Sequence, residues 1–289
     1  MIHVKCVWPA AAVLGEGPVW DEAEQALYWV DIKAPAVHRY VPATGATEGW
    51  PMPERIGCVA RRRQGGFIAA FKSGLAFLDL PSGRIERIGD PEPDLPDNRF
   101  NDGKCDLKGR FWAGTMDDGE TRPTGSLYRV DPDCRWHRMD SGYVVTNGPA
   151  FSPDGATVYH TASVERTIFA FDLAPDGAIS NKRKFIEIPP DAGYPDGMTF
   201  DAEGHLWVAH WGGWRVTRFR PDGTVERTIE FPVAQVSSCV FGGPALDTLY
   251  VTTASVGLDA PSRAKQPLAG GLFEVSVGVQ GLPAPRFAG

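Results

Sequence analysis

The sequence contains few cysteines and no long apolar segment. Its five cysteines are scattered and odd in number, and none forms a CxxC pair, so their spacing predicts neither a zinc knuckle nor a disulfide scaffold. No apolar run approaches the roughly 20 residues that span a bilayer, and residues 1–8 lack the basic region and apolar run of a signal peptide. We therefore expect a cytoplasmic protein with no membrane partner.

Positive charge is also in short supply. The chain has 29 lysines and arginines against 36 aspartates and glutamates, which gives a formal net charge of -7 at pH 7. A protein with this net negative charge repels phosphate groups, so neither nucleic acid nor an anionic membrane is expected as the main partner. The basic run at residues 61–63 follows a predicted strand and is interpreted as a solvated edge or turn. We expect a small-molecule ligand and a monomer.

Amphipathic helix patterns are absent too. The 289 residues include 33 glycines and 25 prolines, a content that favours many short strands joined by turns over long helices. With 43% hydrophobic residues, the chain can fill a sizeable core. Because repeat folds of this length commonly form one domain, we expect a single domain over residues 1–289.

What the chain does contain is an internal repeat. A short apolar strand recurs at intervals of about 40 to 50 residues, and a polar turn precedes each copy. The six copies span residues 27–30, 67–70, 111–114, 158–161, 206–209 and 249–252. A further strand follows them at residues 37–40, 75–78, 126–129, 168–171, 216–219 and 272–275.

These units predict the fold. Four short antiparallel strands in each unit are typical of a propeller blade, so six units predict an all-β, six-bladed β-propeller. The last unit lacks an outer strand, and residues 2–7 can supply it, which would close the last blade and remove a free sheet edge. A β-sandwich would not explain six equivalents of the same three-strand pattern.

One position of the repeat carries mostly polar residues. The residues that precede the first strand of each unit are, in chain order, Glu16, Ile56, Asp102, Asn147, Asp196 and Ser237. First strands line the centre of a propeller, so these side chains are expected to converge at one mouth of the channel. Carboxylates gathered there would repel each other without a cation, and their oxygens suit a divalent metal. The alternative is a set of turn residues that cap the strands.

A cation and a second amide lie next to the third of these positions. Arg99 and Asn101 precede Asp102, and beside a metal they suit a polyhydroxylated ligand whose carbonyl develops negative charge. The acidic loop 117–125 separates the second and third strands of the same unit. Its length and its glycine and proline content predict that it overhangs the mouth.

Five ordered motifs extend this interpretation. They are LGEGPVW at 14–20, NRFNDGK at 98–104, GTM at 114–116, NGPAFSPDG at 147–155 and PDGM at 195–198. Together they resemble the gluconolactonase / regucalcin (senescence marker protein) / luciferin-regenerating family, and residues 238–243 and 266–271 resemble its C-terminal signatures. The resemblance covers essentially the whole chain and implies a six-bladed propeller, in agreement with the repeat count.

The resemblance also implies roles for individual residues. The positions that match the family's metal ligands are Glu16, Asn147 and Asp196. The positions that match its substrate contacts are Arg99 and Asn101. The family has a further acidic residue after Gly-Thr-Met, which in this chain is either Asp118 or Glu120. Asp102 would have a water-mediated or indirect role at the metal.

These expectations combine into a metal-dependent lactonase, which hydrolyses a sugar aldonolactone to the aldonic acid. The metal is one of Fe²⁺, Zn²⁺, Mn²⁺, Ca²⁺ or Mg²⁺. Asp196 would be both ligand and base, with a metal-bound hydroxide as the alternative nucleophile. The resemblance favours a pentono- or hexonolactone as the substrate. Within this class it favours a xylono- or arabinonolactone, and xylonolactone is the first choice. The alternatives are a non-catalytic calcium-binding propeller and a hydrolase of another ester class.

Overall fold

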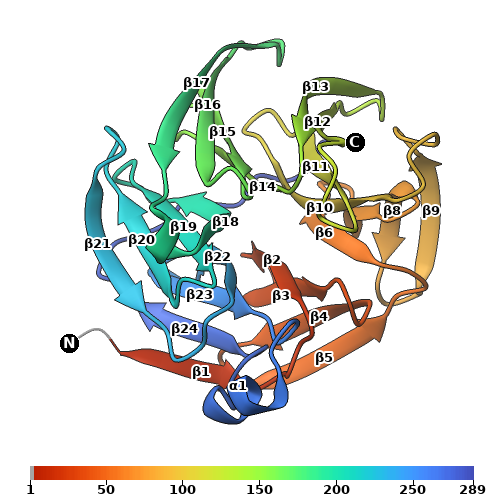
Figure 1. Ribbon diagram of the computed structural model, residues 1–289. Helices are drawn as coiled ribbons and strands as arrows, with labels where there is room; N and C mark the ends of the chain where they lie inside the picture. The colour runs from red at the N-terminus through yellow and green to blue at the C-terminus, as the bar shows by residue number, and fades with distance from the viewer. Residues whose placement is uncertain (1–2) are drawn as a thin grey trace.

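Each of the six repeats folds into a four-stranded antiparallel sheet, and the sheets are arranged in a ring (Figure 1). The computed structural model describes residues 3–289 of the chain. The architecture is therefore the predicted all-β, six-bladed propeller, and we number its blades from the blade that begins with residue Gly15. In the first five blades the first strand is the innermost and the fourth is the outermost.

The strands match the repeat in number and order. The inner strands are β2 (Gly15–Asp21), β6 (Ile56–Arg61), β10 (Asn98–Cys105), β14 (Thr146–Phe151), β18 (Tyr194–Phe200) and β22 (Val236–Gly242). The second strands are β3 (Ala26–Asp31), β7 (Phe67–Phe71), β11 (Phe111–Asp117), β15 (Thr157–Ala162), β19 (Leu206–Trp211) and β23 (Thr248–Thr253). The third strands are β4 (Ala36–Val41), β8 (Gly74–Asp79), β12 (Gly125–Val130), β16 (Thr167–Leu173), β20 (Arg215–Phe219) and β24 (Leu272–Ser276).

The outer strand of the last blade comes from the start of the chain. The other five outer strands are β5 (Ala46–Pro51), β9 (Arg84–Gly89), β13 (Trp136–Tyr143), β17 (Ile179–Glu187) and β21 (Val225–Glu230). In the sixth blade, β1 (Val4–Trp8) pairs antiparallel with β24, with Val4 opposite Val275 and Lys5 opposite Glu274. This pairing confirms the predicted closure; of the predicted segment 2–7, residue Ile2 lies outside the described residues.

Apolar residues of neighbouring blades pack together and hold the ring. Most buried hydrophobic residues fall into six clusters, and each cluster lies mainly between one pair of adjacent blades. The second strands contribute large side chains, among them Trp112 and Trp207, which are completely buried. Their indole Nε1 atoms donate to the carboxylates of Asp106 and Asp201 at 2.9 and 2.8 Å, so these polar groups are satisfied within the core.

Every inner strand contains a bulge near its start. The register with the second strand shifts by one extra residue between Glu16 and Val19 in β2 and between Pro195 and Met198 in β18, and equivalent shifts occur in the other four inner strands. A bulge bends the strand and redirects side chains. Blades also approach closely here, because a Cβ at Gly57 would lie 2.5 Å from the carbonyl oxygen of Phe100.

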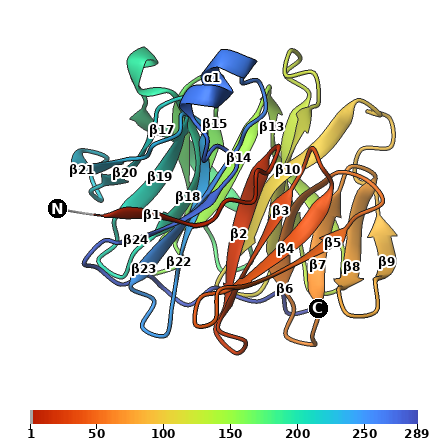
Figure 2. The ribbon, with the colours of Figure 1, turned by 90° about the horizontal axis from the view of Figure 1, so that it is seen from below.

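The structure also contains short helices that the sequence analysis did not predict. The α-helix α1 (Ala260–Lys265) lies in the connection between β23 and β24, and one 3-10 turn covers Pro190–Ala192. Six residues are too few to give an amphipathic period, although Asp259 caps α1 by accepting from the Ser262 backbone N–H at 2.8 Å. Helix α1 rises above one end of the ring (Figure 2). No helix among residues 3–289 is long and apolar enough to cross a membrane.

The chain ends in a tail that crosses the opposite end of the ring. After β24, the backbone N–H of Gly281 donates to Leu246 in the sixth blade at 2.7 Å. Further on, the N–H of Phe287 donates to Arg61 in the second blade at 2.8 Å, and that of Ala288 donates to Gly109 in the third blade at 2.9 Å. The phenyl ring of Phe287 is completely buried. The tail therefore joins blades that are distant in the chain.

Phe287→Ala should consequently destabilise the protein by about 3–5 kcal/mol, because truncating a buried phenylalanine leaves a cavity. The measurement is chemical denaturation beside the control Val225→Ala, which changes a residue that is 55% exposed on an outer strand and is expected to stay within about 0.5 kcal/mol. Equal effects of the two variants would show that the tail does not support the ring.

Candidate active site

A pocket of about 540 Å³ opens at the end of the ring where the inner strands begin. Five of the six blades contribute to it, and the second blade supplies none of its lining residues. The predicted site residues that line it are Glu16, Arg99, Asn101, Glu120, Asn147 and Asp196. The remaining lining residues are Leu14, Lys33, Met116, Val145, Ser163, Val164, Tyr194, Pro195, Trp211, Gln235, Val256 and Gly257.

Three of the six aligned repeat positions do not line this pocket. Ile56 is apolar and completely buried. Ser237 donates its hydroxyl to the carbonyl of Gly15 at 2.5 Å. Asp102 accepts from the backbone N–H of Gly103 at 2.7 Å and from that of Gly148 at 3.0 Å. Glu16, Asn147 and Asp196 therefore converge on the pocket. The side chains of Ile56 and Ser237 contact core or backbone, and Asp102 lies near the two carboxylates but does not line the pocket.

The aligned residues also lie inside their strands, which corrects the expectation that they precede them. Asp196 is the third residue of β18, and it lies in the stretch where the pairing with β19 is interrupted. Glu16 and Asn147 lie at the start of the corresponding interruptions in β2 and β14. The sequence suggested a strand start because the glycines and prolines that follow these residues resemble a turn, whereas they form the bulges.

The carboxylates of the pocket are buried close to each other. Glu16 is 4% exposed and Asp196 is 5% exposed. Burial, and then the charges of Glu16 and Asp102, raise the pKa of Asp196 well above its usual range. Burial and the charge of Asp102 likewise raise the pKa of Glu16. Without a cation, the ionised form of both side chains is therefore less favourable in the folded state than in the unfolded chain.

The donor atoms of this group fit a divalent cation. Oδ1 of Asp196 is buried and has no hydrogen-bond partner in the described structure. One carboxylate oxygen of Glu16 accepts from the Gly17 N–H at 3.1 Å, which leaves the other without a recorded hydrogen bond. With the amide oxygen of Asn147 this gives three oxygen donors, the set that hard cations prefer. No cluster of three His, Cys, Asp or Glu side chains suited to a metal occurs in residues 3–289, and the fit depends on the Asn147 amide.

A chain of hydrogen bonds fixes that amide. Nδ2 of Asn101 donates to Oδ1 of Asn147 at 2.9 Å and to the backbone oxygen of Thr146 at 2.7 Å. Nδ2 of Asn147 donates to Oγ of Ser163 at 2.9 Å. The Asn147 oxygen is therefore oriented by its neighbours and keeps one lone pair for a further partner. This network resembles the outer shell that orients ligands in metal sites.

Arg99 extends this hydrogen-bond network within the third blade. Its side chain is almost completely buried, and its guanidinium donates to Oδ1 of Asn101 at 2.6 Å and to Oδ1 of Asp118 at 2.9 Å. Asp118 also pairs with Arg55. Although burial acts in the opposite direction, the charges of Arg99 and Arg55 lower the pKa of Asp118. Asp118 does not line the pocket, so the structure places it behind Arg99.

The loop 117–125 brings Glu120 to the pocket. Asp117, at the end of β11, accepts from the Arg122 side chain and from the backbone N–H of Thr121, and these hydrogen bonds hold its pKa well below the usual range. Glu120 has a positive φ of 56° and its N–H donates to the Asp117 carbonyl at 2.9 Å. The loop therefore has a fixed base, and Glu120 rather than Asp118 is the carboxylate that faces the pocket.

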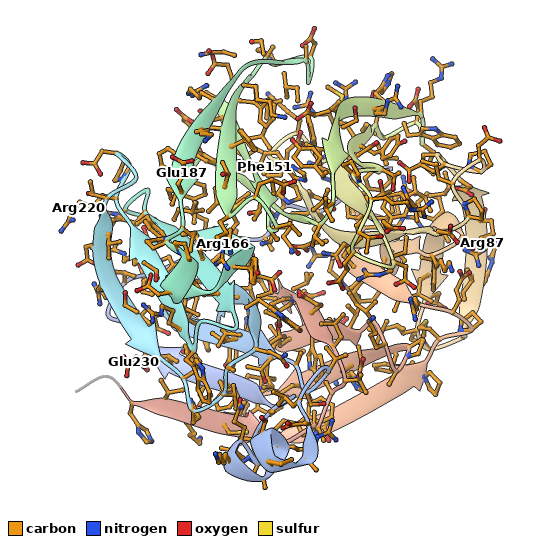
Figure 3. All side chains as sticks on the ribbon, viewed as in Figure 1. Arg87, Phe151, Arg166, Glu187, Arg220 and Glu230 are labelled. Atoms are coloured by element: carbon orange, nitrogen blue, oxygen red, sulfur yellow. The ribbon has the colours of Figure 1, made fainter. Side chains whose placement is uncertain are left out.

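Sequence analysis missed much of the pocket wall. Lys33, Ser163 and Trp211 all lie in or at the turn that follows the second strand of their blades. The repeat could have indicated these positions, because equivalent turns of all blades open at the same end of the ring. Tyr194 forms part of the wall and its ring packs under the guanidinium of Arg166 at 3.8 Å. Figure 3 shows Arg166 near the inner rim, far from Arg220.

Comparison with known proteins agrees with this fold. Residues 14–255 match the model of the SMP-30/Gluconolactonase/LRE-like region. The chain is 40% identical to 6-deoxy-6-sulfogluconolactonase of Pseudomonas putida, over 99% of each chain. It is 39% identical to L-arabinolactonase of Azospirillum brasilense, over 96% of this chain and 92% of the relative.

A solved structure has the same fold as this chain. The calcium-binding protein regucalcin of Agrobacterium tumefaciens strain C58 superimposes with a TM-score of 0.95 at 29% identity, over 99% of this chain and 97% of that one. The fold and pocket define a six-bladed propeller with a carboxylate-lined central site. This chain belongs to the SMP-30/gluconolactonase/LRE-like family, as the motifs had indicated.

The raised carboxylate pKa values make a prediction for the metal-free protein. Its folded state binds protons at Asp196 more tightly than the unfolded chain does, so this contribution to stability is present below about pH 4 and is lost as the pH rises towards neutrality and above. Asp196→Asn removes the buried charge. In chelator at pH 8, Asp196→Asn should therefore be more stable than wild type by on the order of 1–2 kcal/mol, and the difference should shrink at pH 5.

Thermal unfolding at the two pH values measures this difference. The control is Asp94→Asn, which removes a carboxylate from an exposed loop and should give no pH-dependent gain. A metal-free Asp196→Asn protein that is less stable than wild type at both pH values would contradict the electrostatic argument.

Proposed function

We propose that this protein hydrolyses a sugar aldonolactone to the open-chain aldonic acid with one divalent cation in the pocket. The observation that carries the proposal is the convergence of Glu16, Asn147 and Asp196 on one buried site beside Arg99 and Asn101. Three oxygen donors suit a cation, and a buried guanidinium with an amide suits sugar hydroxyls and a carbonyl.

The named activities of the relatives support this reaction. One relative is named for a sulfogluconolactone and another for L-arabinolactone, so hydrolysis of sugar lactones is represented among proteins that match nearly the full length of this chain. We propose a pentono- or hexonolactone as the substrate of this chain, with xylonolactone favoured. The relative described as calcium-binding supports a divalent cation and leaves its identity open.

Glu16, Asn147 and Asp196 would hold the cation. A divalent cation there would supply Lewis-acid polarisation of the lactone carbonyl. The Asp196 carboxylate would hold the cation through one oxygen, and its other oxygen would accept a proton from water as the water oxygen adds to that carbonyl. When the bond from the carbonyl carbon to the ring oxygen breaks, the same carboxyl group would return the proton to the leaving oxygen.

The neighbouring residues would bind and orient the sugar. Arg99 and Asn101 face the pocket from β10, and their mutual hydrogen bond of 2.6 Å fixes their relative positions. Glu120 would accept hydrogen bonds from hydroxyl groups at the loop side of the pocket. Asp118 would act as a positioning residue, because it holds the Arg99 guanidinium from behind.

The competing function is a non-catalytic calcium-binding propeller, which the description of the regucalcin relative favours. A lactone panel on metal-stripped protein separates the two. We expect no turnover above spontaneous hydrolysis in chelator, and recovery when one of Fe²⁺, Zn²⁺, Mn²⁺, Ca²⁺ or Mg²⁺ is added back. Metal binding without turnover of any lactone would favour the binding protein, and turnover of organophosphates or simple esters alone would favour another ester class.

Replacements of Asp196 should separate its two proposed roles. Asp196→Asn keeps an oxygen ligand and removes the base, so we expect it to retain metal binding while losing about 10²- to 10⁴-fold in turnover. Asp196→Ala should lose both. Calorimetric metal titration beside lactone hydrolysis measures the two effects. Near-normal turnover of Asp196→Asn at saturating metal would show that Asp196 is a ligand only.

Substitutions in the acidic loop 117–125 should separate the proposed role of Asp118 from that of Glu120. Asp118→Asn loosens Arg99, so it should lower kcat/KM for every lactone by about tenfold without changing their order. Glu120→Gln changes a group that faces the sugar and should alter the order of preference among lactones. Steady-state kinetics on a panel of pentono- and hexonolactones measures both effects. A uniform loss in Glu120→Gln would place Glu120 with Asp118 as a positioning residue.

We also infer the compartment, the domain organisation and the oligomeric state of the protein. The five cysteines are all free, which suits the reducing cytoplasm proposed from the sequence. A single domain over residues 1–289 is supported by the closure of the last blade by β1. A monomer with a small-molecule partner remains our proposal.

A further inference from the structure

One wall of the pocket has no part in the proposed reaction. It is built by the fifth, sixth and first blades and includes Lys33, Trp211, Gln235 and Val256. These residues are contiguous: the backbone of Trp211 bridges to Gln235, and the side chains of Trp211 and Val256 pack on the hydrophobic cluster that contains Ile32. Arg99, Asn101 and Glu120 come from the third blade. A sugar held by them would direct its other substituents towards the unassigned wall.

The turn that carries Lys33 is held firmly. The Asp31 carboxylate is 3% exposed. It accepts from the backbone N–H groups of Val13 at 2.8 Å, Leu14 at 3.1 Å, Lys33 at 3.1 Å and Ala34 at 2.9 Å. These hydrogen bonds tie the turn to the segment that also lines the pocket at Leu14. They also occupy the Asp31 carboxylate with backbone groups, and Asp31 forms no ion pair with the Lys33 ammonium.

Lys33 differs from the other cation of the pocket in having no acidic partner. Arg99 is balanced by Asp118. No ion pair or side-chain hydrogen bond of the Lys33 ammonium occurs within residues 3–289. Since Lys33 is half-buried at the pocket wall, its charge is available to a ligand and is less screened than on an open surface.

Gln235 adds a neutral group beside this cation. Its side-chain amide makes no hydrogen bond to the part of the chain that the structure describes, and its Oε1 is buried. A buried amide oxygen without a hydrogen-bond partner is costly. An amide can donate to one oxygen and accept from a hydroxyl at once, which suits the polyhydroxylated chain of a sugar.

We propose that this wall is a second recognition site, in which Lys33 binds an anionic group at the end of the sugar farthest from the lactone carbonyl and Gln235 binds the adjacent hydroxyl. The inference rests on the proposed lactone hydrolysis and extends its substrate class to lactones with a terminal carboxylate, sulfonate or phosphate. A charge-assisted hydrogen bond to a half-buried ammonium provides the discrimination.

The test compares two lactones that differ only in this group. D-glucono-1,4-lactone ends in a neutral hydroxymethyl group, and D-glucaro-1,4-lactone ends in a carboxylate. In Lys33→Met, kcat/KM for the glucarolactone should fall about ten- to hundredfold, while the value for the gluconolactone should change about twofold or less. Lys33→Arg should retain most of the activity on the charged lactone.

Lys72→Met is the matched control. Lys72 occupies the equivalent turn of the second blade, at the same end of the ring, but does not line this pocket. The substitution Lys72→Met removes the same charge from the same end of the ring as Lys33→Met does. A general electrostatic effect on kcat/KM would therefore be equal in both variants. An unchanged ratio of the two kcat/KM values in Lys33→Met, or an equal change in Lys72→Met, would overturn the proposal.

Binding of the products distinguishes this inference from the proposed function. Calorimetry on the metal-loaded protein should show tighter binding of glucarate than of gluconate, and Lys33→Met should remove that preference. If neither lactone is hydrolysed but the Lys33-dependent preference for glucarate remains, the reaction is wrong and the recognition site stands. If both lactones are hydrolysed and no preference depends on Lys33, the recognition site is wrong and the reaction stands.

Discussion

The bulge in each inner strand is the constraint on which the site depends. In a regular strand, side chains alternate between the two faces, and both faces of these inner strands pack against neighbouring blades. One extra residue interrupts the pairing and frees Glu16, Asn147 and Asp196 for the pocket. The same backbone irregularity that would weaken an ordinary sheet therefore supplies the oxygen donors. In the blades that do not need a ligand, the position holds Ile56 or Ser237 and serves packing.

Much of the fold could be predicted because it repeats. Apolar strands such as 206–209 and 249–252 alternate with polar turns at a regular interval, and sixfold repetition outweighs the weak signal of any single strand. The predicted outer strand at the start of the chain follows from a missing partner, which the pairing of β1 with β24 supplies. The helix α1 was missed because its six residues have no repeat equivalent and too few turns for a period.

The sequence could predict where the site lies, but not the hydrogen bonds that connect its side chains. The repeat placed Glu16, Asn147 and Asp196 together because equivalent residues of different blades meet around one axis. It could not show that Asn101 orients Asn147, or that Asp118 lies behind Arg99 while Glu120 faces the pocket, since these depend on side-chain hydrogen bonds between blades. Sequence alone also could not show that the Asp102 carboxylate accepts hydrogen bonds from the backbone N–H groups of Gly103 and Gly148.

The pairing of β1 with β24 has a consequence for how the protein is made. Strand β1 leaves the ribosome before the other strands, and its partner β24 follows only about 270 residues later in the chain. At the usual speed of translation, about 5–20 residues per second, β1 waits for tens of seconds with unpaired backbone groups. The ring cannot close during that time, and the inner strands of the first and sixth blades remain apart. The central site is thus assembled only after β24 has been made, when β1 and β24 meet in one sheet.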